Sequence, residues 1–269
     1  MIRCLVPGLL FTACAARPPT PPAAVAPAGF QWTADVELVD LTHTFDERTL
    51  YWPTSPSTFD QQTLFEGQTE AGFYYSARTY AAPEHGGTHL DAPVHFAEGM
   101  SSAEALPVER FVAPGVVVDM REAAAADADA LLTVEHLDNW ESAHGPIRAG
   151  SIVLVRSGWA ERWPDRLRYL GDDTPGDASN LHFPGISREA AEWMVGREIG
   201  AVGIDTASID HGPSTDFIAH QVLMAADIPA FENVALTADL PARLPLVMAL
   251  PMKIGNGTGG PLRVVAVLP

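Results

Sequence analysis

Short apolar runs, separated by segments of helical character, constrain the fold of this chain more than any other feature of its sequence. Several runs are continuously apolar over most of their length, which is typical of strands buried on both faces. Together with weaker candidates, the expected strands lie at 36–41, 115–120, 151–156, 201–204, 246–250 and 262–267. Helices are expected between strands at 134–143, 187–196 and from Ser214 to about Asp227. Strands mixed with helices predict a layered α/β or α+β domain.

The chain is expected to form one folded domain, at residues 32–269, behind a targeting segment. Its 269 residues are 47% hydrophobic, enough for one large core, and no internal linker divides them. Residues 1–13 are interpreted as an export signal, because a basic start and an apolar run are followed by small residues before Cys14. This pattern resembles a bacterial lipoprotein signal, in which Cys14 is lipidated and anchors an exported protein on the periplasmic side; ordinary secretion and an uncleaved tail are the alternatives. The Pro/Ala-rich residues 14–31 are expected to form a stiff tether.

The charge balance excludes several classes of partner. Acidic residues outnumber lysine and arginine by 34 to 16, which gives a formal net charge of -18. Such an excess repels phosphate backbones and anionic membrane surfaces, so we expect no nucleic-acid partner and membrane contact only through the lipid anchor. A small, neutral or weakly polar molecule remains compatible, because local pocket residues decide what binds.

The segment 85–96, His-Gly-Gly-Thr-His-Leu-Asp-Ala-Pro-Val-His-Phe, carries the strongest chemical signal. Three histidines and an aspartate in it have odd numbers, so on an extended backbone they project to one side. They are His85, His89, Asp91 and His95. Imidazole and carboxylate ligands suit a divalent ion such as zinc, manganese or iron, and three such ligands leave positions open for water. Surface histidines in a polar turn are the alternative, although one short segment holds three of the chain's nine histidines.

A second pair of candidates lies further along the chain. His220 falls in the helix expected from Ser214, and Glu232 follows twelve residues later, after the turn at Pro229. Helix, turn and returning strand can bring both side chains to one pocket. Spacing alone leaves the alternative open, in which His220 is an ordinary helix histidine and Glu232 has no special role.

A family resemblance joins these segments. The pattern His-x-Gly-Thr-His-x-Asp-x-Pro-x-His-Phe at 85–96, with Asp-Thr-x-Ser-x-Asp at 205–210, His220 and Glu232, resembles the cyclase family of metal-dependent hydrolases. This family includes bacterial kynurenine formamidases and isatin hydrolases, and the likeness runs from about Val39 to the C-terminal strand. It implies a swivelling β/β/α-type fold, one or two divalent ions, Zn or Mn, and a homodimer or homotetramer.

The resemblance also implies roles for particular residues. His85, His89 and Asp91 match the core metal ligands, His95 matches a histidine that transfers protons or binds a second ion, and His220 and Glu232 match additional metal-site positions. Groups that orient the ligands are expected at Ser208, Asp210 and Asn233, with a simple turn role as the alternative.

The activity that this resemblance implies is hydrolysis of a carbon-nitrogen bond. The substrate would be an aryl formamide or an aromatic-fused cyclic amide, attacked by water that the ion activates, with His95 or Glu232 as the catalytic proton-transfer group. Candidates for an aromatic wall around the substrate, each with core packing as its alternative, are Trp52, Phe73, Tyr74 and Phe96. Competing interpretations are a hydrolase of another cyclic amide or lactone, an exported metal-binding protein without catalysis, and an envelope protein with a degenerate site.

Overall fold

One large sheet organises the protein, whose structure, a computed structural model, describes residues 36–268. Its order is β1 (Glu37–Asp40), β12 (Gly259–Leu268), β11 (Arg243–Pro251), β5 (Val112–Asp119), β7 (Ile152–Arg156), β9 (Ala201–Ile204), β10 (Ala230–Glu232) and β4 (His89–Asp91). Strand β4 pairs with β10 and also with β12, so the sheet closes on itself. The mixed α/β layering agrees with the expected fold class. The expected signal at 1–13, Cys14 and the tether at 14–31 lie outside the described residues and stay predictions.

The centre of the sheet is parallel and fully buried. Strands β5, β7, β9 and β10 run parallel to one another, and every residue of β7 and β9 is buried. Both strands lie where the apolar runs predicted them, because a parallel strand covered on both faces has no polar side to show. Their carboxyl ends meet at one edge of the sheet.

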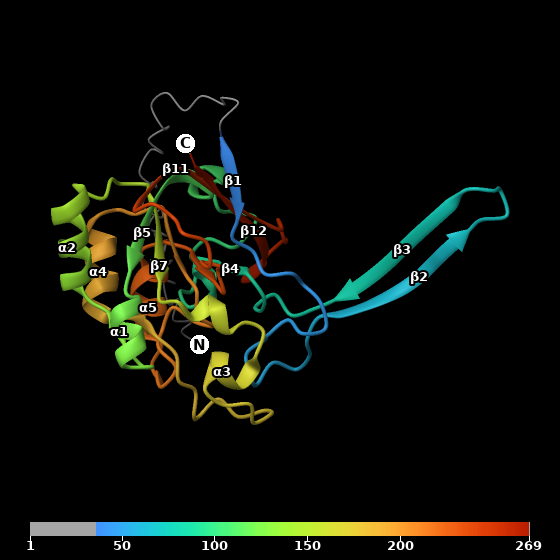
Figure 1. The fold of residues 1–269 in the computed structure, drawn as a ribbon, viewed down its shortest axis with the longest axis horizontal. Coiled ribbons are helices and arrows are strands. Elements are labelled where there is room, and N and C mark those ends of the chain that lie inside the picture. The colour runs from blue at the N-terminus through green and yellow to red at the C-terminus, as the bar shows by residue number, and fades with distance from the viewer. Residues whose placement is uncertain (1–35, 269) are drawn as a thin grey trace, which may run out of the picture.

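The helices α2 (Val134–His144), α4 (Arg188–Gly196) and α5 (Ile218–Ala225) cover one face of this sheet, and the other face lines the interior of the closed ring (Figure 1). The buried residues of α1 (Arg121–Ala126) and α3 (Arg166–Leu170) belong to a separate core cluster. Short elements complete the fold: η1 (Pro93–His95), η2 (Val108–Arg110), η3 (Trp159–Arg162), β6 (Leu131–Leu132) and β8 (Gly185–Ile186). Leu137 of α2, Met194 of α4 and Leu223 of α5 belong to the core cluster between helices and sheet. Among the helices of residues 36–268, none has the length and apolar character of a membrane span.

Helix α4 confirms its expected cap, whereas the predicted start of α5 was wrong. The Ser187 hydroxyl accepts the amide of Ala190, as an N-cap does. Helix α5 begins at Ile218, after Phe217 in the left-handed region at φ 50°. The Ser214 hydroxyl accepts the amide of Phe217 instead and closes a turn before the helix.

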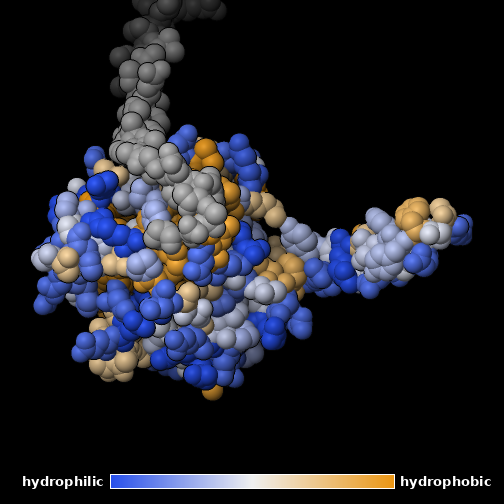
Figure 2. All heavy atoms as spheres, turned by 45° about the horizontal axis from the view of Figure 1, so that its top comes forward, coloured by the Kyte–Doolittle hydropathy of each residue, from blue (hydrophilic) through white to orange (hydrophobic). Residues whose placement is uncertain are grey.

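A long hairpin was not predicted from the sequence. Strands β2 (Asp60–Gln68) and β3 (Tyr74–Ala81) pair antiparallel and project away from the body of the molecule (Figure 1). Nearly all their residues are exposed on both faces, and the arm carries exposed apolar and aromatic side chains (Figure 2). We call residues 60–81 the hairpin arm.

Candidate metal centre and catalytic pocket

Strand β4 carries two of the candidate ligands on one face. His89 and Asp91 alternate with Leu90, which packs into the core inside the ring, so the two polar side chains face the other way. In the antiparallel register, Glu232 of β10 lies opposite His89 and Gly259 of β12 lies opposite Asp91. The ligand strand is therefore held by backbone pairing along both of its edges.

Two glycines of the histidine segment allow the chain to pack closely around the site. At Gly87, with φ 59°, a Cβ atom would lie 2.5 Å from the Phe45 ring, and at Gly86 it would collide with the Tyr51 ring. The Gly87 carbonyl accepts the Asn233 side-chain amide at 2.7 Å and lies 3.0 Å from Nδ1 of His89. This second contact leaves Nε2 of His89 facing the carboxylates.

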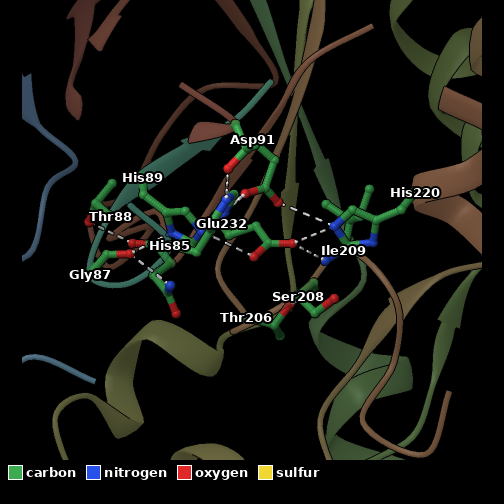
Figure 3. A network of polar contacts seen from close by, with 12 residues as sticks. His85, Gly87, Thr88, His89, Asp91, Thr206, Ser208, Ile209, His220 and Glu232 are labelled. Atoms are coloured by element: carbon green, nitrogen blue, oxygen red, sulfur yellow. Dashed lines mark hydrogen bonds and ion pairs between the residues drawn. The ribbon is translucent and has the colours of Figure 1, made fainter. Parts of the chain in front are cut away.

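Five side chains converge at this point and form two overlapping triads (Figure 3). One triad is His85, His89 and Asp91, and the other is Asp91, His220 and Glu232. Asp91 belongs to both. Its Oδ1 lies 2.6 Å from Nδ1 of His85 and 3.2 Å from Nε2 of His89, and its Oδ2 lies 3.2 Å from Nε2 of His220.

Helix α5 and strand β10 bring the distant pair to the site. Nε2 of His220 lies 3.2 Å from Oε1 of Glu232, and Oε2 of Glu232 lies 3.5 Å from Nε2 of His89. Helix, turn and returning strand are arranged as the sequence suggested. Asp210 holds His220 from behind, because its Oδ2 lies 2.6 Å from Nδ1 of His220 and its Oδ1 accepts the Ala219 amide.

The site concentrates charge in a buried setting. Burial alone would lower the pKa of His89, but Asp91 and Glu232 raise it to about 9. Burial alone would raise the pKa of Asp91, but His89 and His85 hold it well below its usual range. Burial and the nearby Asp91 carboxylate raise the pKa of Glu232. Without an ion, the carboxylates therefore favour the protonated form of the His89 imidazole, and hydrogen bonds to Asp210 and Asp91 likewise raise the pKa of His220.

His95 differs from the other candidates. It lies in η1, and its ring stacks on that of His85 with centroids 3.9 Å apart. It belongs to neither triad, so the structure does not group it with the metal ligands. Burial lowers the pKa of His95 to about 4, so its imidazole is neutral near pH 7.

The triads open into a cavity of about 400 Å³. Trp52, Phe96 and Phe217 line it with the ligands, and the rings of Trp52 and Phe217 pack edge to face with their centroids 6.2 Å apart. Mostly apolar walls around a few convergent polar groups are typical of a small-molecule site. Trp52 and Phe96 thus lie where an aromatic wall was expected.

Two of the predicted wall residues lie elsewhere. Phe73 and Tyr74 are at the turn of the hairpin arm, each 59% exposed, and do not line the pocket of their own chain. The aromatic character of Phe73 and Tyr74 does not show where in the fold they lie, and the sequence pattern does not predict the projecting hairpin.

The supporting residues surround the triads. Ser208 lines the pocket and its hydroxyl accepts the Asp210 amide at 3.2 Å, while Asn233 adopts φ 53° and holds Gly87. Sequence reasoning missed Thr258, whose Oγ1 lies 2.8 Å from Nε2 of His85 and donates to Glu84. Thr258 lies in the glycine-rich segment before β12. No spacing rule links that segment to His85, so the sequence alone does not assign Thr258 to the site.

Comparison with known proteins places this site in a family. Residues 39–211 match the family model described as "Putative cyclase". The chain belongs to the cyclase family. An isatin hydrolase from Roseibium aggregatum is 34% identical over 194 residues, which cover 69% of this chain and 72% of that protein. A kynurenine formamidase from Bordetella avium is 29% identical over 226 residues, 80% of this chain and 96% of that protein.

Solved structures of other cyclase-family members agree with the fold. Isatin hydrolase A from Labrenzia aggregata, bound to benzyl benzoate, superposes with a TM-score of 0.78 at 33% identity, covering 87% of this chain and 94% of that chain. An isatin hydrolase bound to the product analogue thioisatinate also gives 0.78, at 30% identity and with 87% and 93% covered. The expected cyclase-family hydrolase is confirmed.

The residues present suit a divalent metal ion. Two buried carboxylates and three imidazoles face one another, and of the described residues that line the pocket none is lysine or arginine. The negative charge of Asp91 and Glu232 is therefore balanced by histidine protons or by a cation. Three imidazole and two carboxylate ligands suit zinc or manganese. Because the two triads share Asp91, the site can hold one ion or two.

Proposed function

We propose that the protein is a metal-dependent hydrolase that cleaves the amide bond of an aromatic-fused cyclic amide, as in isatin. The observation that carries this proposal is the pair of metal-binding triads at the base of an apolar, aromatic-lined cavity. Two solved isatin hydrolases superpose on the chain at 33% and 30% identity, and one holds a product analogue. Open-chain aryl formamides are the second candidate, favoured by the kynurenine formamidase that is 29% identical.

The pocket residues define how the reaction proceeds. A divalent ion held by the triads would lower the pKa of water and polarise the substrate carbonyl. His95, which lines the pocket outside both triads, would accept the proton of the attacking water as hydroxide adds to the carbonyl carbon. The carbon-nitrogen bond then breaks, and His95 returns the proton to the departing nitrogen. An amine and a carboxylic acid result, and the acid loses its proton to solvent to give a carboxylate. Trp52 and Phe96 flank the planar substrate.

Position favours His95 over Glu232 as the proton acceptor. Both Glu232 oxygens are engaged, since Oε1 accepts the Ile209 amide at 2.9 Å and lies near His220, and Oε2 faces His89. His95 lines the pocket outside both triads. We therefore assign metal binding to Glu232 and proton transfer to His95.

A substrate panel with metal analysis tests the proposal. Protein reconstituted separately with zinc and with manganese is assayed with isatin, N-formylkynurenine and a simple lactone. We expect turnover of isatin that disappears after chelation and returns when the ion is restored. Faster turnover of N-formylkynurenine than of isatin would instead identify open-chain aryl formamides as the substrate class. Metal binding without turnover of any compound would favour the metal-carrier interpretation, and activity that survives exhaustive chelation would remove the metal from the mechanism.

We also propose that the protein is a homo-oligomer joined through the hairpin arm. A two-stranded hairpin is marginally stable alone in water and needs a surface to cover it. The arm exposes a set of apolar and aromatic side chains, with exposed fractions between 41% and 66%: Leu64, Phe65, Phe73, Tyr74, Tyr75 and Tyr80. A second copy of this chain is the occupant to which the proposal commits, because two such arms offer one another matching aromatic surfaces.

A further inference from the structure

A second cavity, of about 450 Å³, lies away from the catalytic pocket. It is formed by α2, the carboxyl ends of β5 and β7, and the segment 239–242 that leads into β11. The lining residues that matter here are Asp119, Arg121, Trp140, Arg156, Asp239 and Leu240. None of its lining residues lines the catalytic pocket.

Arg156 places a poorly compensated cation in this cavity. It ends β7 and is 5% exposed, and within residues 36–268 its Nε has no hydrogen-bond partner. Its Nη1 lies 3.9 Å from Oδ1 of Asp239, beyond hydrogen-bond distance. Leaving a buried N–H without a hydrogen-bond partner is costly, because the group loses hydration that nothing replaces.

The other charged groups nearby relieve Arg156 only in part, through attraction between its charge and the Asp119 carboxylate, whose pKa is lowered mainly by Arg121 and also by Arg156. Asp119 already accepts two hydrogen bonds from Nε and one from Nη2 of Arg121, at 2.6 to 3.0 Å. The side chain of Asp239 is fully exposed, so water screens its charge. A second buried arginine shows how such a group is normally satisfied: Nη1 of Arg110 donates to the carbonyls of Gly200 at 3.1 Å and Ile199 at 3.4 Å.

We propose that this cavity binds a small organic ligand through a single carboxylate group on Arg156. The planar guanidinium fork matches the two oxygens of a carboxylate. Asp119 and Asp239 also line the cavity, so a phosphate dianion would meet like charge that a monoanion tolerates. Trp140, fixed by its indole donation to the Val117 carbonyl at 2.8 Å, and Leu240 supply an apolar wall for the body of the ligand. The site is a carboxylate site separate from the metal centre.

Calorimetric titration of the metal-loaded protein with sodium benzoate, sodium acetate and inorganic phosphate tests this assignment. We expect binding in the order benzoate, acetate, phosphate, and at least a tenfold loss of benzoate affinity in Arg156→Met. The same loss of benzoate affinity on Arg156→Met is expected in protein that also carries His89→Ala. This result would distinguish benzoate bound at Arg156 from benzoate bound at the metal centre. Benzoate binding of equal strength with and without Arg156 would overturn the proposal.

Two further variants keep the test decisive. Arg156→Met should have a Tm at or above that of the wild type, because the substitution removes a buried and poorly compensated charge. The matched variant Arg110→Met should have a lower Tm, because it leaves two backbone carbonyls without their hydrogen-bond donor. A fall in Tm for Arg156→Met as large as that for Arg110→Met would show that the guanidinium is already satisfied, contrary to the proposal. Asp239→Asn, at a fully exposed position whose charge water screens, is the surface control and should bind benzoate as the wild type does; a loss as large as that in Arg156→Met would count against the site.

Discussion

Asp91 is the residue on which the candidate centre depends most. Its two oxygens face different triads, Oδ1 towards His85 and His89 and Oδ2 towards His220. It is 1% exposed, so water does little to screen these contacts. The position of a single carboxylate therefore couples the ligand strand β4 to the distant helix α5.

Replacing His89 by Ala should abolish metal retention and turnover together. Its Nε2 faces both carboxylates and its other nitrogen lies next to the Gly87 carbonyl, so no neighbouring group is positioned to replace it. Loss of a residue that supports a metal ligand typically reduces activity by roughly 10- to 100-fold, and we expect loss of the ligand His89 itself to reduce turnover further. Metal content by mass spectrometry and steady-state assays measure the effect. His182→Ala, at a 45% exposed surface histidine, is the control and should match the wild type.

Asp210→Asn tests the support behind a ligand. The Oδ2 atom of Asp210 lies 2.6 Å from Nδ1 of His220 and fixes which ring nitrogen faces the site. An amide in its place should lower metal affinity by about 10- to 100-fold and leave the fold intact. Competition with a chelator of known affinity measures the loss. Asp216→Asn, in the exposed turn before α5, should have no effect, and equal affinities for both variants would remove Asp210 from the site.

Metal affinity should depend on pH because His89 carries a proton in the metal-free protein. Burial alone would lower its pKa, but Asp91 and Glu232 raise it to about 9. A ligand imidazole must be neutral, so below this pKa an ion has to displace the proton. The apparent affinity should increase at least tenfold per pH unit up to roughly pH 9, because hydrogen bonds to Asp210 and Asp91 raise the pKa of His220 as well and its proton also has to leave. Chelator competition across this range measures the slope, and a flat profile would show that no proton is displaced.

At the scale of elements, the glycines of β12 set how closely two strands approach. A Cβ atom at Gly259 would collide with the Leu90 carbonyl and lie 2.7 Å from Cε1 of His85. Gly259→Ala should displace the His85 ring or part β12 from β4, and an error of about 1 Å in a site can reduce the rate about 100-fold. Activity and metal affinity measure the effect. In Gly255→Ala the added methyl group meets nothing within 4 Å, so wild-type behaviour is expected there.

The elements that could be predicted are those whose own pattern decides their structure. Strand β9 has the predicted bounds, and α2 (Val134–His144) extends the predicted helix by one residue, because a covered parallel strand and a capped helix carry their signals locally. The histidine segment also predicted a metal site from its residue types. Its backbone is extended only in β4, however, and His95 lies in η1. His220 and Glu232 required the family resemblance, since no spacing rule links a helix to a strand across a turn.

Other features depend on contacts that the sequence does not display. The hairpin arm was missed because its strands bury neither face in this chain, so polar and aromatic residues follow no alternation of apolar and polar positions. The start of α5 was placed too early because Ser214 caps a turn as readily as it caps a helix. Thr258 was missed because its partner His85 is 173 positions away.

At the scale of the whole molecule, the chain combines a strong net charge with one projection that exposes several apolar and aromatic side chains. A net charge of -18 opposes close approach of two copies, so any assembly needs a contact in which apolar burial outweighs repulsion. The hairpin arm is where such burial is available, because Phe65 and Tyr75 stack on each other at 5.8 Å while both remain largely exposed. The same stacked pair gives the most direct test of assembly.

Replacing Phe65 and Tyr75 together by Ser should convert the oligomer into monomers. The substitutions remove the stacked aromatic pair from the arm, and a stable interface needs about 1,200 to 2,000 Å² of well-packed surface, which the remaining arm residues do not readily provide. Sedimentation velocity measures the mass, and circular dichroism confirms that the body of the fold is retained. Val108→Ser, at an apolar residue 58% exposed in η2 and away from the arm, is the matched control and should sediment as the wild type does. A wild-type protein that sediments as a monomer at micromolar concentration, or a double variant that assembles unchanged, would show that the arm has another partner.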